Sequence, residues 1–121
     1  MRKILFMYAL TFVGCIQLSY AARAKCPDAN TIQHSIVAGQ HGYQVHKYAG
    51  TSTGARQIIF TNMDDRDTSP LRQPQDPAEA EAFGNQLACL YQGDGLALTT
   101  SDAGAVKDCH AIPGTPYFDC Q

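Results

Sequence analysis

Several features that identify common protein classes are absent from this chain of 121 residues. It contains no Cys-x-x-Cys pair, and zinc sites are usually built on such closely spaced ligands. It also lacks the Gly-x-Ser-x-Gly elbow of many hydrolases and a glycine loop that could cradle a phosphate. The length excludes several domains and a long coiled coil, and the short apolar runs exclude a multi-span membrane protein.

Clusters of basic residues are also absent once residues 1–24 are set aside. The remaining 97 residues hold six basic side chains against eleven acidic ones, a net charge of −5. The basic residues are scattered singly: Lys25, Lys47, Arg56, Arg66, Arg72 and Lys107. Nucleic acids and anionic membrane surfaces are recognised by clustered positive charge, so neither is an expected partner.

Large apolar side chains are scarce in the same segment. Only 16 of its 97 residues are Leu, Ile, Val or Phe, a fraction at which highly charged chains usually stay disordered. We therefore expect cross-links to supply stability that burial alone cannot supply.

The residues present at the N-terminus predict export. Arg2 and Lys3 precede an apolar run over 4–14, which is typical of a signal peptide and too short to span a bilayer. The small-x-small pattern of residues 22–24 predicts cleavage before Lys25, and residues 19–21 offer a second cleavage pattern. We expect a signal peptide over 1–24 and one domain over 25–121, secreted to the periplasm or the medium.

An alternative processing route is left open by residues 12–15. The segment Phe-Val-Gly-Cys resembles a bacterial lipobox, in which cleavage before the cysteine accompanies acylation of its thiol. The product would be a lipoprotein anchored to the envelope through Cys15. Either route leaves four cysteines in the exported domain.

Those four cysteines predict a disulfide framework, for which three connectivities exist. We favour Cys26–Cys89 with Cys109–Cys120, each contributing about 2–4 kcal/mol. If residues 86–110 form a three-stranded meander, Cys89 and Cys109 lie on next-but-one strands about 9–10 Å apart, too far for a disulfide. A catalytic thiol is not expected, because export oxidises exposed cysteines.

A β-hairpin is predicted to join residues 31–38 to residues 42–49 through a turn over 39–42. Placing Ala38 opposite Tyr43 collects most of the apolar side chains on one face. This register puts His34 and His46 on opposite faces of the hairpin. A third strand is expected over 56–61.

A helix is predicted over 77–83, after an exposed loop over 62–76. Asp76 can cap its first turn, Pro77 suits its first position, and Glu79 can complete a capping box. A second hairpin is expected to join 86–91 to 96–100, followed by a turn over 101–104 and a weak strand over 105–110. The predicted class is α+β, mainly β: a small antiparallel sheet or sandwich-like domain with one short helix and two disulfides.

The candidate site residues are histidines, aspartates and tyrosines. His110 and His46 are the candidate histidine ligands for a metal, and Asp64, Asp65 and Asp67 form an acidic loop that could bind Ca²⁺. The EF-hand spacing is missing, so a solvated loop is the simpler interpretation. Tyrosines at strand positions are candidates for a recognition surface or for core packing: Tyr43, Tyr48 and Tyr91.

The order of short motifs resembles an uncharacterised family of small secreted bacterial proteins. The shared features are a signal peptide, Cys26-Pro27, an isoleucine-bearing first strand, the Cys89-x-Tyr91 strand and a C-terminal cysteine pair ending at Cys120. The resemblance implies a secreted β-rich domain and carries no activity or functional residue.

These observations together predict an exported, non-enzymatic binding module that acts as a secreted effector or an envelope protein. Its partner is expected to be another protein or a host-side ligand, and it is expected to be monomeric and free of cofactors. The alternatives are a small secreted hydrolase or metal-dependent enzyme, and the lipoprotein described above.

Overall fold

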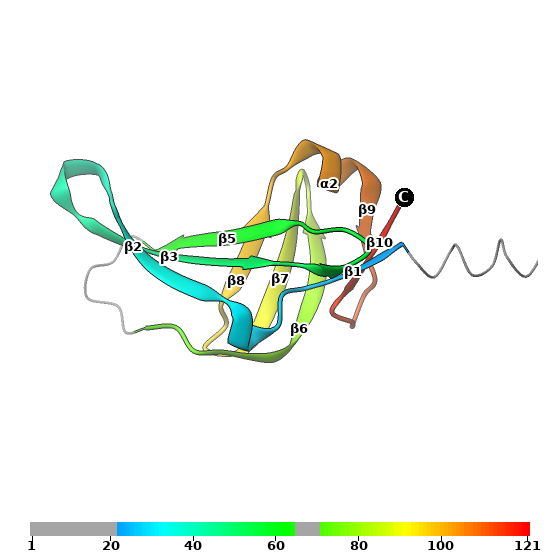
Figure 1. Ribbon diagram of the computed structural model, residues 1–121, viewed down its shortest axis with the longest axis horizontal. Helices are drawn as coiled ribbons and strands as arrows, with labels where there is room; N and C mark the ends of the chain where they lie inside the picture. The colour runs from blue at the N-terminus through cyan, green and yellow to red at the C-terminus, as the bar shows by residue number, and fades with distance from the viewer. Residues whose placement is uncertain (1–21, 65–70) are drawn as a thin grey trace, which may run out of the picture.

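In the part of the chain that the structure describes, the strands form two antiparallel sheets, and the larger has six strands in the order β2-β3-β5-β8-β7-β6. The computed structural model describes residues 22–64 and 71–121, and Figure 1 shows how its elements are arranged. The six strands are β2 Gln33–Ala38, β3 Gln44–Thr51, β5 Ile59–Asp64, β6 Pro74–Phe83, β7 Gln86–Gly93 and β8 Ala97–Thr100. The β2–β3 hairpin extends away from the rest of the chain (Figure 1).

The smaller sheet has the order β4-β1-β10-β9 and lies at the opposite end from the hairpin tip (Figure 1). Its strands are β1 Arg23–Lys25, β4 Thr53–Gly54, β9 Cys109–Ala111 and β10 Tyr117–Cys120. Two 3-10 turns, η1 Ala29–Thr31 and η2 Gln40–Gly42, and the short helix α2 Ala103–Asp108 complete the described elements. The predicted class, mainly antiparallel β with little helix, is confirmed.

The two sheets share one core and are joined by a disulfide. Phe60 of β5 and Phe118 of β10 are fully buried, and their stacked rings have centroids 5.8 Å apart. Cys26, directly after β1, is bonded to Cys89 of β7. The second bond joins β9 to β10 within the smaller sheet, through Cys109 and Cys120. Both favoured pairings are therefore confirmed, and two disulfides indicate a non-reducing, extracellular or periplasmic environment.

The first hairpin forms as predicted, but its register is shifted by one residue. Ala38 pairs with Gln44 rather than with Tyr43. The turn is longer than expected, because the Gly39 N–H donates to the Tyr43 carbonyl (2.7 Å) and His41 adopts φ 62° inside η2. A shift of one residue reverses the faces of one strand relative to its partner, so the predicted sharing of faces between the two strands was wrong.

The predicted helix over 77–83 is wrong, because this segment belongs to strand β6. Ala78 and Ala80 are buried while Glu79 is exposed, which is the period of two that a half-buried strand requires. The Asp76 carboxylate does not cap a helix; it accepts from the Ala29 N–H at 3.1 and 3.2 Å. Capping residues favour a helix only when no strand is available to pair with the same segment. This segment pairs with β7, so it forms a strand.

The segment expected to be a turn and a weak strand is mostly the helix α2. The Asp102 side chain accepts from the Ala105 N–H at 3.0 Å and so caps the helix. The strand that follows, β9, pairs with β10 in the smaller sheet, so the expected third strand of a meander is wrong. The second hairpin, β7–β8, is present. The expected loop over 62–76 is shorter at both ends, because β5 continues to Asp64 and β6 begins at Pro74.

Candidate functional site

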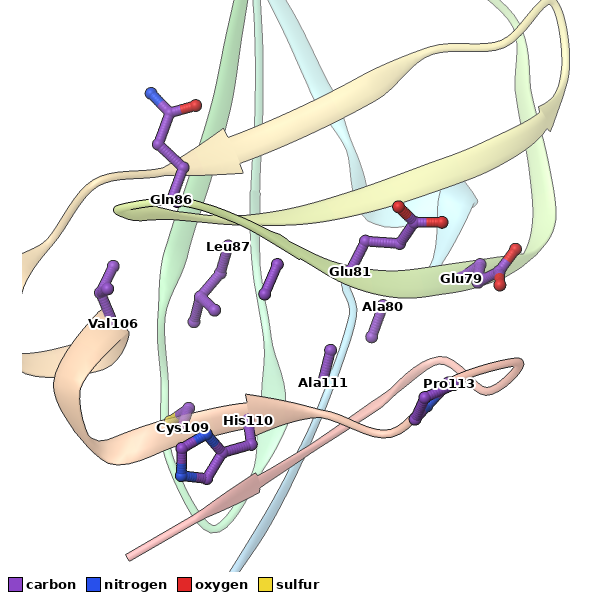
Figure 2. A pocket seen from close by; sticks show the side chains of 12 residues that line it. Glu79, Ala80, Glu81, Gln86, Leu87, Val106, Cys109, His110, Ala111 and Pro113 are labelled. Carbon is purple, nitrogen blue, oxygen red and sulfur yellow. The ribbon is translucent and has the colours of Figure 1, made fainter.

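A groove of about 500 Å³ lies between β6, the edge strand of the larger sheet, and β9, the edge strand of the smaller one. Its volume is within the range of small-molecule and peptide-anchor pockets. Figure 2 shows small and apolar side chains between the two strands, with α2 closing one end. These side chains are Ala80, Leu87, Val106, Cys109 and Ala111.

The β6 side of the groove is bonded at Ala80 and has no strand partner beyond it in the described residues. The Ala80 N–H donates to the Thr115 carbonyl at 2.8 Å, so it faces away from β7. Amide groups along a strand point alternately to its two sides, so Ala82 presents its N–H and carbonyl on the same free edge. Within residues 22–64 and 71–121, no strand pairs with this edge.

The β9 side faces the groove in the same way. The Ile112 N–H donates to the Tyr117 carbonyl at 3.0 Å, which directs the backbone of Ile112 towards the chain of β10. Ala111, one residue earlier, therefore turns its N–H and carbonyl towards the groove. The groove is thus bordered by two strand edges, and each turns the N–H and carbonyl of one residue, Ala82 or Ala111, towards it.

The outer face of β6 is acidic beside the groove. Glu79 and Glu81 project from alternate positions of the strand, and Figure 2 shows both carboxylates on the side of β6 opposite the Ala80 methyl group. In the described part of the chain, neither carboxylate takes part in an ion pair. Phe83, the next residue of the same row, is exposed to 53%.

The candidate histidines lie in two separate places. His110 is an exposed residue of β9 at the groove, whereas His46 lies on the hairpin beside His34. The Nε2 atom of His34 and the Nδ1 atom of His46 are 2.7 Å apart, and the two rings stack. The expectation that these two histidines point to opposite faces was therefore wrong, and the one-residue shift in register is the reason.

The candidate aspartates do not form a metal site in the described residues. Asp64 lies opposite His46 in the register of β3 and β5 and forms an ion pair with Arg72, with Nε and Oδ2 3.8 Å apart. Asp65 and Asp67 lie outside the described residues. Across 22–64 and 71–121, no three His, Cys, Asp or Glu side chains are grouped to hold a metal ion.

The three candidate tyrosines have different environments. Tyr43 lies at the hairpin turn and is 61% exposed, whereas Tyr48 and Tyr91 belong to the core. The Tyr48 hydroxyl accepts from the Arg72 N–H at 2.9 Å, and the Tyr91 hydroxyl donates to the Pro27 carbonyl. Burial of its phenol, with a smaller effect of nearby carboxylates, raises the pKa of Tyr91 above its ordinary value. Of the three, only Tyr43 is accessible to a partner.

The groove between β6 and β9 was not predicted from the sequence. Its only trace there is the alternation of alanine and glutamate over 78–82, which the capping residues before it obscured. No family model, curated protein or solved structure matches the chain. In the described residues, no helix is both long and apolar enough to cross a membrane.

Proposed function

We propose that this chain is an exported binding module that captures an extended, positively charged segment of a partner protein in the groove between β6 and β9. The observation that carries the proposal is the pair of facing strand edges, β6 and β9, on either side of one cavity. Addition of a strand to a free sheet edge is a general mode of peptide recognition, in which main-chain hydrogen bonds supply affinity.

The side chains of β6 indicate what such a segment would contain. A strand added at Ala82 on this edge places side chains of one face beside Glu81 and Phe83, and Glu79 lies two residues further along the same row. Lysine or arginine complements the two carboxylates, and an apolar residue complements the exposed phenyl ring. The intervening side chains point towards Ala80 and Leu87, so they must be apolar. The ligand class is a segment that alternates basic and apolar residues.

Binding of short synthetic peptides tests the proposal directly. The probe is a capped six-residue peptide that alternates lysine and valine, and its control replaces each lysine with glutamate. Isothermal titration calorimetry should show saturable one-to-one binding of the basic peptide and none of the acidic one. Equal binding of both peptides, or no binding of the basic one, would overturn the proposal.

Two proline variants separate edge pairing from non-specific attraction. Ala82→Pro removes an N–H from the free edge of β6, where a strand tolerates proline. Ile36→Pro is the matched control on β2, the other edge strand of the same sheet. The Gly39 N–H faces β3, and amide groups alternate along a strand, so the Ile36 N–H faces outward. We expect Ala82→Pro to weaken peptide binding at least tenfold and Ile36→Pro to leave it unchanged. Equal affinities of the two variants contradict strand addition at β6.

The charge requirement has its own variant. Opposite charges paired across strands contribute roughly 0.2–1 kcal/mol each, so the double change Glu79→Gln and Glu81→Gln should weaken binding about 2- to 30-fold. Both glutamines keep the size and the strand preference of the parent side chains. An unchanged affinity would show that the carboxylates do not recognise the lysines.

A further inference from the structure

Strand β1 is an internal strand of the smaller sheet. It pairs with β10 through Arg23–Asp119, Ala24–Phe118 and Lys25–Tyr117. On its other side it pairs with β4, with Ala24 opposite Gly54. The residues immediately before Lys25 therefore belong to the folded domain.

The backbone of β1 and of the residue before it is bonded on both sides. The Cys120 N–H donates to the Ala22 carbonyl at 2.8 Å, and the Ala55 N–H donates to the Arg23 carbonyl at 3.0 Å. The packing there is close, because a Cβ atom on Gly54 would lie 2.5 Å from the Arg23 oxygen. Each of these contacts requires a residue that precedes Lys25.

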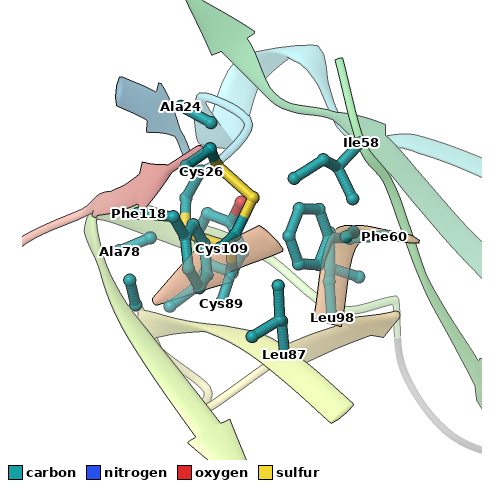
Figure 3. Packing of buried hydrophobic residues seen from close by; sticks show 14 of the residues in the cluster. Ala24, Cys26, Ile58, Phe60, Ala78, Leu87, Cys89, Leu98, Cys109 and Phe118 are labelled. Atoms are coloured by element: carbon teal, nitrogen blue, oxygen red, sulfur yellow. A yellow bond between two sulfur atoms is a disulfide. The ribbon is translucent and has the colours of Figure 1, made fainter. Parts of the chain in front are cut away.

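Ala24 also contributes to the core itself. Its side chain is fully buried, and Figure 3 shows it above the Cys26–Cys89 bond on the side of the core formed by the smaller sheet. Cleavage before Lys25 would place a charged ammonium group next to this core position and would remove two of the three residues of β1. Strand β4, which pairs only with β1 in the described residues, would keep the Lys25–Thr53 pair and lose the Ala24–Gly54 pair.

We propose that the exported chain is processed between Ala21 and Ala22, so that the mature protein begins at Ala22. Ser19 and Ala21 supply the small residues that a leader peptidase requires three and one positions before the cut. Hydrolysis of this peptide bond adds the water hydroxyl to the Ala21 carbonyl carbon and the proton to the Ala22 nitrogen. All of β1 is retained, and the new ammonium group is on Ala22, which is not fully buried.

N-terminal sequencing of the exported product tests this assignment. The full chain is expressed with its own leader in a bacterial host, and the released protein is sequenced and weighed before and after reduction. The expected sequence begins Ala-Arg-Ala-Lys, and reduction should add about four hydrogens. A product that begins at Lys25, or a lipid attached to Cys15, would overturn the assignment.

Two charged substitutions distinguish the two cleavage patterns. Ala21→Glu places a charge directly before the proposed cut, and Ala22→Glu places one three residues before the alternative cut at Lys25. We expect Ala21→Glu to stop cleavage between residues 21 and 22, and Ala22→Glu to leave this cleavage unchanged. Pulse-labelling and the mass of the new product measure both outcomes. The opposite pattern would assign the cut to Lys25. Pulse-labelling detects the cleaved product before an unstable product can be degraded. The result does not depend on whether the groove binds peptides.

Discussion

The two disulfides should differ in their contribution to stability, because they close chain segments of very different length. Cys26 and Cys89 are separated by 63 residues, and Cys109 and Cys120 by 11. In the chain-entropy model these separations give contributions of about 4.3 and about 2.8 kcal/mol at 25 °C. All four cysteines are almost fully buried, so the side-chain burial lost on substitution by alanine is similar for the two pairs.

The perturbation is therefore a pair of double variants, Cys26→Ala/Cys89→Ala and Cys109→Ala/Cys120→Ala. Removal of the Cys26–Cys89 bond also removes the covalent link between the two sheets. We therefore expect the measured loss in the free energy of unfolding to equal the full estimate. A domain of this size is stable by roughly 5–15 kcal/mol. The first variant should therefore lose about 30% or more of its free energy of unfolding, and the second should lose about 1.5 kcal/mol less.

Urea denaturation followed by circular dichroism under oxidising conditions measures both losses. Mass spectrometry confirms that the remaining bond is intact in each variant. A loss below about 1 kcal/mol for Cys26→Ala/Cys89→Ala would show that the apolar core suffices without this cross-link. A larger loss for the 109–120 pair than for the 26–89 pair would refute the argument from segment length.

Two further stability predictions follow from buried polar groups. The unfolded chain loses the Tyr91 phenol proton above about pH 10, whereas the raised pKa keeps the proton on the folded protein. The free energy of unfolding should therefore fall by about 1.4 kcal/mol per pH unit above pH 10. Tyr91→Phe should abolish this fall in urea titrations from pH 8 to 11. Ser52 is buried, donates to the Arg56 carbonyl and accepts from the Ile58 N–H, so Ser52→Ala should cost about 1–3 kcal/mol. Its control, Ser35→Ala on exposed β2, should change stability by less than about 0.5 kcal/mol.

Local patterns in the sequence were sufficient for the disulfides and the hairpins, because both depend on composition and on glycine turns. The register of the first hairpin was not predictable in this way, since it depends on whether His41 adopts a left-handed conformation in the turn. That one conformation decides that His34 and His46 meet rather than face opposite sides. The strand β6 was misassigned because Asp76 and Pro77 favour a helix locally, while the pairing partner that overrides this preference comes later in the chain.

The groove could not be predicted from the sequence for a different reason. It is formed by the edges of two sheets, and tertiary contacts fix the relative position of these sheets. Strands β6 and β9 belong to different sheets, and the Cys26–Cys89 bond connects those sheets. No spacing of residues along the chain indicates that Ala80 and Ala111 lie on opposite sides of one cavity. What the sequence does contain is the alternation of alanine and glutamate that makes β6 acidic on one face.

The scarcity of large apolar residues and the presence of the groove have a common physical cause. A core held by side-chain burial alone would need bulky residues where the two sheet edges approach each other, and leucine at Ala80 or Ala111 would occupy the space between β6 and β9. Because disulfides supply part of the stability, alanine is sufficient at these positions. The small side chains leave the cavity open and the strand edges accessible. The covalent bonds that compensate for a small core thus also permit the feature on which peptide binding is proposed to depend.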